Sequence, residues 1–290
     1  MKNARLFYYA LLFVFILGSF SSANDETKIY GQTPPGLTPE VFAPDIVSTG
    51  SEFSCAMSPD GTEFYFSRFG TNPYHAMMYV QLSDSAITDA IRFPSLQNED
   101  AWEPGLSRDG NTLYFITSKS VPGSTTGSID LWRIERVDGE WSAPIHMESP
   151  FSEMSSLSVS ISDNGTFYTT DNRRGQMGAD IAITRKNHNG KYEDFTILPK
   201  TINTPGMDAY PSIAPDESYL IYTSMGDRKP ELFVSFRSAD GVWSQAQPID
   251  LGELETVAPC LSHDGKYLFF TANSNIYWVS SEIFLQLKPE

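Results

Sequence analysis

Ser58-Pro59-Asp60-Gly61 leads directly into Glu63-Phe64-Tyr65-Phe66, a tight turn followed by an aromatic strand. The same pattern returns four times: Ser107-Arg108-Asp109-Gly110 before Thr112-Leu113-Tyr114-Phe115, Ser162-Asp163-Asn164-Gly165 before Thr166-Phe167-Tyr168-Thr169, Ala214-Pro215-Asp216-Glu217 before Tyr219-Leu220-Ile221-Tyr222, and Ser262-His263-Asp264-Gly265 before Tyr267-Leu268-Phe269-Phe270. The marker residues Asp60, Asp109, Asn164, Asp216 and Asp264 are 49, 55, 52 and 48 residues apart. A period near fifty residues with several strands per unit is typical of β-propellers. We therefore predict an all-β, five-bladed propeller.

Each unit is predicted to hold four antiparallel strands, a to d. Strand a is short and ends at the turn, and strand b is the aromatic run. Strand c alternates apolar and polar residues, as in Leu131-Trp132-Arg133-Ile134, which favours a strand over a helix. A hairpin such as Val137-Asp138-Gly139 follows, and strand d begins Trp141-Ser142-Ala143-Pro144. A proline there suits an outer edge strand, where a missing N–H costs little.

The last unit stops after strand c, near 279–285, and lacks strand d. The missing strand has a counterpart at the other end of the chain, because Val41-Phe42-Ala43-Pro44-Asp45-Ile46-Val47 resembles residues 141–147. We expect this segment to become the outer strand of the last blade. The closure would leave no sheet edge exposed at the ring seam.

The chain begins with a pattern typical of a secretory signal peptide. Lys2 and Arg5 precede an apolar run from Leu6 to Leu17, and Ser21-Ser22-Ala23 supplies small residues for cleavage. A membrane anchor is the competing interpretation, but the run is short for a span of about 20 residues. We predict a signal peptide at 1–23, an extension at 24–37 and the propeller at 38–290, in a periplasmic or secreted protein without an integral membrane segment.

The chain is strongly acidic. Its formal charge is −16, and loss of Lys2 and Arg5 with the signal peptide makes it −18. Nucleic-acid binding needs clustered basic residues, so no nucleic-acid partner is expected. The acidity could favour cationic partners, or it could simply be a solvated surface.

The two cysteines, Cys55 and Cys260, both fall in strand a of their units. Export permits a disulfide. Facing inner strands are usually too far apart for the Cα separation of about 4.4–6.8 Å that a disulfide needs. Two buried free thiols are therefore predicted.

The Ser-Pro-Asp-Gly turns and their order resemble the TolB-like, WD-repeat-like propeller family. The resemblance covers nearly all of the chain after the signal peptide and implies a propeller fold. TolB itself is similar to a six-bladed propeller behind a separate N-terminal domain. Neither that domain nor a sixth unit is found here, so a TolB role in envelope complexes is not implied.

Strand direction sorts the connections onto two faces. The a–b and c–d turns share one face, called here the turn face. The d–a and b–c loops share the other, the loop face, where binding groups are expected. There the candidate ligand-binding residues are Glu52, Arg68, Trp102, Glu103, Asp208, Tyr210, Arg228 and Glu255. Related positions are Asp100, Glu153, Ser155 and Ser156 in d–a loops, and Lys119, Arg173 and Arg174 in b–c loops.

These residues allow two interpretations. One is a polar funnel with aromatic walls that holds a sugar or peptide. The other is a ring of salt bridges between blades, each worth about 0–1 kcal/mol if exposed, with Trp102 and Tyr210 as packing residues. The recurring turn Asp or Asn is expected to bond its own turn backbone.

Sequence signatures of enzymes are mostly missing. There is no Gly-x-Ser-x-Gly elbow, no His-Glu-x-x-His, no Cys-x-x-Cys and no phosphate-binding loop. The four histidines fall in different units, so no metal site and no cofactor are predicted. Our first hypothesis is a non-enzymatic module that binds an unknown protein, peptide or glycan. The alternative is a carbohydrate-active hydrolase or lyase, which needs only two carboxylates about 5–10 Å apart.

Overall fold

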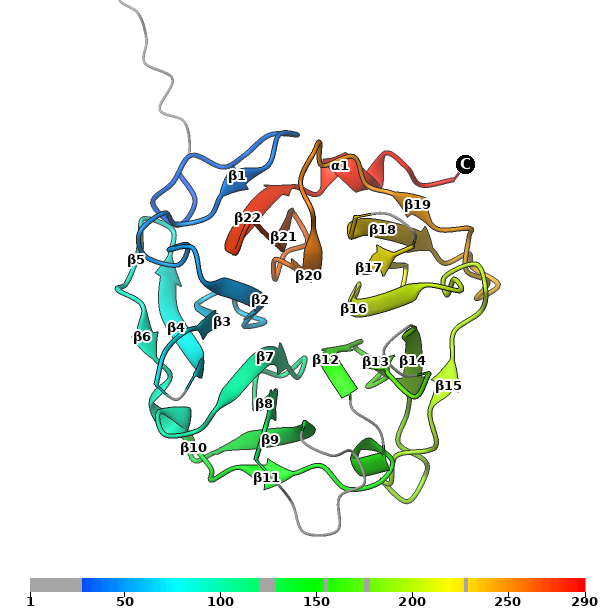
Figure 1. Ribbon diagram of the computed structural model, residues 1–290, viewed down its shortest axis with the longest axis horizontal. Coiled ribbons are helices and arrows are strands. Elements are labelled where there is room, and N and C mark those ends of the chain that lie inside the picture. The colour runs from blue at the N-terminus through cyan, green and yellow to red at the C-terminus, as the bar shows by residue number, and fades with distance from the viewer. Residues whose placement is uncertain are drawn as a thin grey trace, which may run out of the picture.

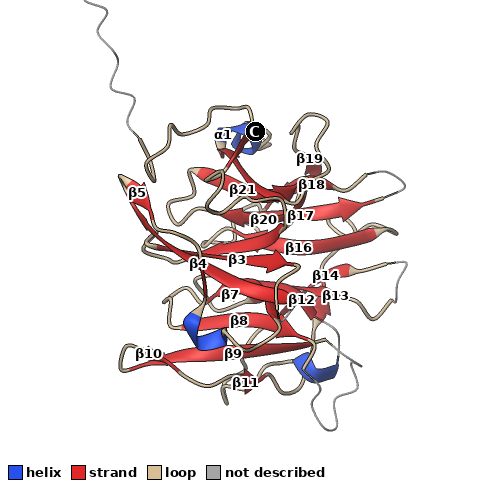
Figure 2. Ribbon diagram, turned by 60° about the vertical axis from the view of Figure 1, so that its left-hand side comes forward, coloured by secondary structure: helices blue, strands red, loops and turns tan. Residues whose placement is uncertain are grey.

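A computed structural model describes residues 28–72, 74–119, 129–153, 156–174, 178–226 and 229–289. Five antiparallel sheets stand around a central axis, as Figure 1 shows, so the predicted five-bladed β-propeller is confirmed. Figure 2 shows that strands dominate and that short helical segments lie at the periphery. The predicted signal peptide lies outside the described residues.

The blades follow one another in chain order. Blade 1 has β2 (Glu52–Met57), β3 (Glu63–Phe69), β4 (His75–Ser83), β5 (Ala86–Ile87) and β6 (Ile91–Arg92). Blade 2 has β7 (Ala101–Leu106), β8 (Thr112–Thr117), β9 (Asp130–Val137), β10 (Glu140–Trp141) and β11 (Ile145–His146). Blade 3 has β12 (Ser156–Ile161), β13 (Phe167–Asp171), β14 (Asp180–Thr184) and β15 (Thr196–Ile197). Blade 4 has β16 (Met207–Ile213), β17 (Tyr219–Met225), β18 (Glu231–Phe236) and β19 (Gln247–Pro248).

Blade 5 combines the two ends of the chain. It contains β20 (Val257–Leu261), β21 (Tyr267–Ala272), β22 (Asn275–Ser280) and, as its outer strand, β1 (Glu40–Val41). β1 pairs antiparallel with β22, Glu40 opposite Trp278, and the Phe42 N–H continues the pairing to the Ile276 carbonyl at 2.8 Å. The predicted closure by the N-terminal segment is thus confirmed, although the regular strand is shorter than the similarity to residues 141–147 suggested. The remaining helical segments are η1 (Pro94–Leu96), η2 (Phe151–Glu153) and α1 (Glu282–Leu285).

The apolar core is divided among the seams between blades. Five buried clusters are found, and each joins side chains of two neighbouring blades. The cluster between blades 5 and 1 also takes in Phe42, which is 0% exposed and whose ring lies 5.1 Å from Phe64 and 5.0 Å from Phe269. Burial of apolar area at every seam therefore fixes the ring.

The recurring turn residue has the structural role that its position predicts. In the first unit the Ser58 hydroxyl donates to Asp60 Oδ1 at 2.6 Å, and the Thr62 N–H donates to the same oxygen at 3.0 Å. These bonds hold the pKa of Asp60 below its usual value, with the Ser58 hydroxyl as the main cause. The carboxylate closes its own turn.

The fourth unit carries Glu217 where the other turns have glycine. Its backbone keeps a left-handed φ of 60°, which disfavours a side chain. The buried carboxylate accepts a hydrogen bond from the Ser162 hydroxyl of blade 3 at 3.0 Å and pairs with Arg237. Glu217 thus offsets its backbone strain by tying blades 3 and 4 together on the turn face.

Candidate functional site

Each inner strand carries a bulge near the axis, on the side of the loop face. The register of every a–b strand pair shifts there, and one residue adopts a left-handed backbone. These residues, called here the bulge residues, are Ser54, Glu103, Ser158, Tyr210 and Ala258, with φ between 49° and 56°. Five strained positions of this kind re-aim the side chains that lie around the axis.

The bulge N–H groups join neighbouring blades. The Ser54 N–H donates to the Thr271 hydroxyl at 3.0 Å, and the Tyr210 N–H donates to the Thr170 hydroxyl at 2.9 Å. Glu103 and Ala258 donate in the same way to Ser67 and Thr223, at 2.8 and 3.0 Å. In all four cases the hydroxyl belongs to strand b of the preceding blade. This seam bond satisfies a backbone donor that burial would otherwise leave unpaired.

The seam between blades 2 and 3 departs from this rule because Ile116 stands at the hydroxyl position, opposite Trp102. The Ser158 N–H bonds instead to the Glu103 carboxylate. Glu103 therefore replaces the missing hydroxyl with one of its two oxygens. The other oxygen, Oε2, is buried without a hydrogen-bond partner.

Burial changes the chemistry of Glu103, which is only 3% exposed. Desolvation raises its pKa to about 8, and the hydrogen bond from Ser158 opposes this shift only partly. Near neutral pH the group is therefore mainly the uncharged acid. A buried, incompletely bonded carboxyl at the axis is the most chemically unusual group in the described part of the chain.

Tyr210 crosses the axis beside Glu103. Its ring lies 5.4 Å from that of Phe53 in an edge-to-face arrangement, although blades 4 and 1 are not neighbours in the ring. Burial raises the pKa of the Tyr210 phenol, and the nearby charge of Glu103 adds to the shift. Contact between rings from non-adjacent blades closes the axis at the level of the bulges.

An aromatic cluster continues from Phe53 outward over blades 1 and 2. Its members, Phe53, Phe69, Tyr74, His75 and Trp102, touch in sequence, with ring centroids 4.1 to 6.4 Å apart. His75 stacks on Trp102, and its Nδ1 is 2.8 Å from Asp100. Tyr74, at the outer end, is 62% exposed. The loop face thus offers aromatic surface that leads toward Glu103.

Glu52 and Arg68 form an ion pair whose role is structural. Arg68 Nε donates to Glu52 Oε1 at 2.8 Å, and its Nη2 donates to the Ile46 and Val47 carbonyls. Glu52 also accepts the Thr49 N–H at 2.7 Å, and its side chain is 0% exposed. The pair fixes the N-terminal segment against blade 1.

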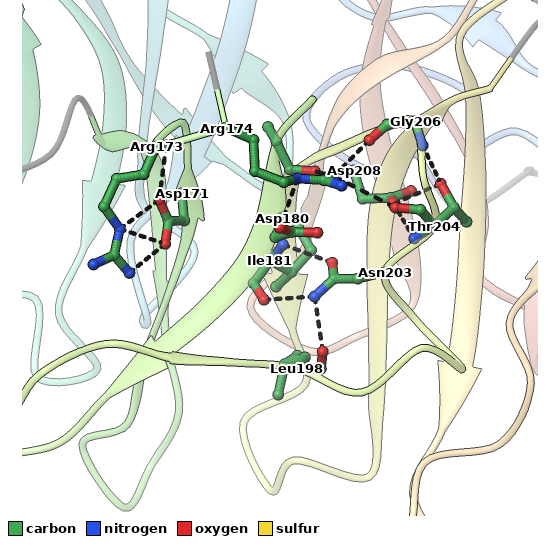
Figure 3. A network of polar contacts seen from close by, with 11 residues as sticks. Asp171, Arg173, Arg174, Asp180, Ile181, Leu198, Asn203, Thr204, Gly206 and Asp208 are labelled. Carbon is green, nitrogen blue, oxygen red and sulfur yellow. Dashed lines mark hydrogen bonds and ion pairs between the residues drawn. The ribbon is translucent and has the colours of Figure 1, made fainter. Parts of the chain in front are cut away.

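Asp208 has a similar role in blade 4. It is 0% exposed and accepts hydrogen bonds from the Thr204 N–H and hydroxyl and from the Ser224 hydroxyl. Figure 3 shows how Arg174 closes the same corner, donating to the Gly206 carbonyl while it pairs with Asp180 at 2.8 Å.

The remaining charged positions are dispersed. Arg173 pairs with Asp171 on the opposite side of the network in Figure 3, with Nη2 and Oδ2 2.6 Å apart. Glu255 is exposed in the loop before β20, and Lys119 Nζ lies 3.5 Å from Glu99. Arg228 and Ser155 lie outside the described residues. Of the predicted site residues, Trp102, Glu103 and Tyr210 surround the axis, while Glu52, Arg68 and Asp208 support loops.

A narrow cavity of about 90 Å³ occupies the axis on the other side of the bulges. Ser54 and Ser158 lie at its inner end, and Pro59, Arg108, Pro215 and His263 line it near the turn face. Ligand pockets usually measure about 300–1,000 Å³, so this cavity suits a few waters rather than a ligand. This cavity lies toward the turn face, so it does not bear on the polar funnel predicted on the loop face, which stays a prediction.

Sequence reasoning missed Phe53, Phe69, Tyr74 and His75. Phe53 is the residue before a bulge, a position shared with Trp102. Aligning the inner strands of the units would have shown two large aromatic residues at one structural position. Among the described residues, no group of three His, Cys, Asp or Glu side chains could hold a metal ion, and no helix is long and apolar enough to cross a membrane.

The strand-b hydroxyls that accept the bulge N–H groups allow a direct test. Ser67→Ala should leave the Glu103 N–H buried and unpaired, at a cost of about 1–3 kcal/mol of unfolding free energy. Ser67→Thr is the matched control, because threonine performs this role at three other seams. Chemical denaturation would measure both; equal stabilities of the Ala and Thr variants would show that the seam bond contributes little.

No family model matches the chain. Among characterised proteins, it is 38% identical over 64 residues to serine/threonine-protein kinase TOS3 of Saccharomyces cerevisiae. That match spans 21% of this chain and 11% of the kinase, so it shows no family.

Solved structures agree on the fold. A TolB protein of Agrobacterium tumefaciens is 15% identical with a TM-score of 0.52, over 80% of this chain and 77% of that one. The tricorn protease is also 15% identical, with a TM-score of 0.51 over 82% of this chain but only 22% of its own. TolB of Acinetobacter baumannii gives a TM-score of 0.48 at 15% identity, over 80% of this chain and 54% of that one. The two matches with TM-scores above 0.5 support a TolB-like propeller fold, as the turn motifs predicted, and identities this low show the fold alone.

Proposed function

We propose that the protein is an exported, non-enzymatic binding module, periplasmic or secreted, whose ligand lies on the loop face over the aromatic cluster and the bulge residues. The observation that carries the proposal is Glu103: a carboxyl 3% exposed, with one oxygen unpaired, beside Tyr210 at the axis. A ligand hydroxyl or carbonyl oxygen would accept the hydrogen bond that the protonated Oε2 offers.

The aromatic cluster supports a glycan or peptide ligand. Tyr74 and Phe69 stack with an interplanar angle of 7°, which presents flat apolar surface of the kind that sugar rings and apolar side chains bind. The chain's charge of −16 disfavours anionic ligands. Neutral oligosaccharides and neutral or basic peptides are therefore the first classes to test.

Catalysis finds less support in the described residues. A glycosidase needs two carboxylates at the substrate. Asp171 and Asp180 each pair with an arginine, and Asp100 bonds to His75 and to the Ser118 hydroxyl. These acids are committed to structure rather than presented to a reacting bond.

Tyr74→Ala tests the proposed surface with little risk to folding, since the side chain is 62% exposed. We expect Kd for a bound oligosaccharide or peptide to rise about two- to ten-fold, because one aromatic contact is worth about 0.5–1.5 kcal/mol. Calorimetric titration after a thermal-shift screen would measure it.

Val242→Ala is the matched control, as Val242 is 66% exposed in a c–d turn on the turn face. It should bind like the wild type. A ligand whose affinity responds to neither substitution, or to both equally, would place binding elsewhere on the molecule.

A further inference from the structure

Cys55 and Cys260 occupy facing positions at the seam where the ring closes. Each bulge residue is followed by two residues that line the axial cavity. Gly105 of blade 2 approaches Val159 of blade 3, and the repeat places the second of these residues in each blade opposite the first in the next. The facing pairs are Ala56 with Pro104, Gly105 with Val159, Ser160 with Pro211, Ser212 with Pro259, and Cys260 with Cys55. The only two cysteines of the chain thus form one pair.

Other seams show how close these positions come. A Cβ at Gly105 would lie 2.7 Å from the Val159 carbonyl oxygen, so the two backbones approach directly. The Ser160 hydroxyl accepts the Ile213 N–H of the next blade at 3.0 Å, so a side chain at the Cys260 position reaches across its seam. At the closing seam itself, Cys260 packs against the apolar cluster that contains Cys55.

Both cysteines are free thiols in the structure, but only Cys55 is buried, whereas the sequence predicted two buried thiols. Cys55 is 5% exposed, whereas Cys260 is only partly buried and donates its S–H to the Leu261 carbonyl at 3.5 Å. Burial, together with a hydrogen bond to Cys260, raises the pKa of the Cys55 thiol. Both side chains line the same axial cavity, and Cys260 packs against the cluster that contains Cys55, so the two thiols lie at one seam.

We propose that Cys55 and Cys260 are a disulfide site that covalently links the first and last blades. The oxidant is a disulfide, either a small molecule or an exchange protein. The Cys260 thiolate attacks one sulfur of this oxidant, which forms a mixed disulfide on Cys260 and releases the other sulfur as a thiol. The Cys55 thiolate then attacks the Cys260 sulfur and expels the second thiol. Two protein thiols are oxidised, one disulfide is reduced to two thiols, and the two protons end on those thiols.

The test uses the full chain and hydroxyethyl disulfide, a probe small enough for a narrow cavity. Native protein and protein refolded from the reduced state are both incubated with it, then alkylated and mapped by mass spectrometry. We expect a peptide linking Cys55 to Cys260 in at least one arm, with the loss of two hydrogen atoms. Two alkylated thiols, or mixed disulfides that persist in both arms, would overturn the proposal.

Stability provides a second readout. A disulfide closing so long a loop should raise Tm by about 5–15 °C for a chain of this size. Dithiothreitol should abolish the increase in the wild type and have no effect on Cys55→Ala or Cys260→Ala. Because mapping on the wild type needs no variant, failure of either variant to fold leaves the test intact. A reductant-insensitive Tm in cross-linked wild type would contradict a linkage that stabilises the ring.

Discussion

Glu103→Gln should remove a pH-dependent loss of stability that the wild type shows between about pH 4 and pH 9. The pKa of Glu103 is raised from 4.5 to about 8 in the folded protein, mainly by desolvation. Between these values the native state holds a proton that the unfolded chain has released. Unfolding free energy therefore falls as pH rises, by about 1.4 kcal/mol per pH unit at the steepest part of this range.

The stability difference between the Glu103→Gln variant and the wild type should therefore grow in favour of the variant with pH, by as much as about 5 kcal/mol. The amide can still accept the Ser158 N–H through its oxygen, so the seam stays bonded. Urea denaturation at several pH values measures this difference. Glu255→Gln, which removes an exposed carboxylate, controls for the loss of one charge. If the difference between the Glu103→Gln variant and the wild type were constant with pH, Glu103 would not be buried as an acid.

The single change Ile116→Thr, made with Glu103 in place, extends the same argument. A threonine at position 116 would restore the hydroxyl that Ser67, Thr170, Thr223 and Thr271 supply at other seams. Ser158 would then no longer depend on residue 103. Glu103 would be retained only for what its second oxygen binds, which separates its structural role from a ligand-binding one.

The repeat pattern was sufficient to predict the architecture, since turn residues, strand alternation and the similarity of residues 41–47 to 141–147 are local features. The site was harder, because it depends on distances across the ring. Tyr210 contacts Phe53 of a non-adjacent blade, which no local pattern indicates. Nor does any local sequence pattern predict a left-handed backbone at a tyrosine. Sequence placed Glu52 and Asp208 among ligand-binding acids, but loop N–H groups and hydroxyls surround both.

Phe42→Ala should be among the most destabilising single substitutions in the chain. Its buried ring contacts Phe64 of blade 1 and both Phe269 and Trp278 of blade 5, at 5.1, 5.0 and 5.3 Å. Truncating such a residue removes buried apolar area and leaves a cavity, at a cost of about 3–5 kcal/mol. Unlike a core residue within one blade, Phe42 also holds the outer strand that completes the ring.

Leu37→Ala is the matched control, because Leu37 lies five residues earlier in the same N-terminal segment and is 53% exposed. Denaturation should show a large loss for Phe42→Ala and little change for Leu37→Ala. Limited proteolysis adds a local readout: once Phe42 no longer anchors it, the segment before β2 should be cleaved faster than the rest of the chain. Similar stabilities and cleavage rates for the two variants would mean that the ring does not depend on its N-terminal strand, since closure at that seam would then rest on β20 and β2 alone.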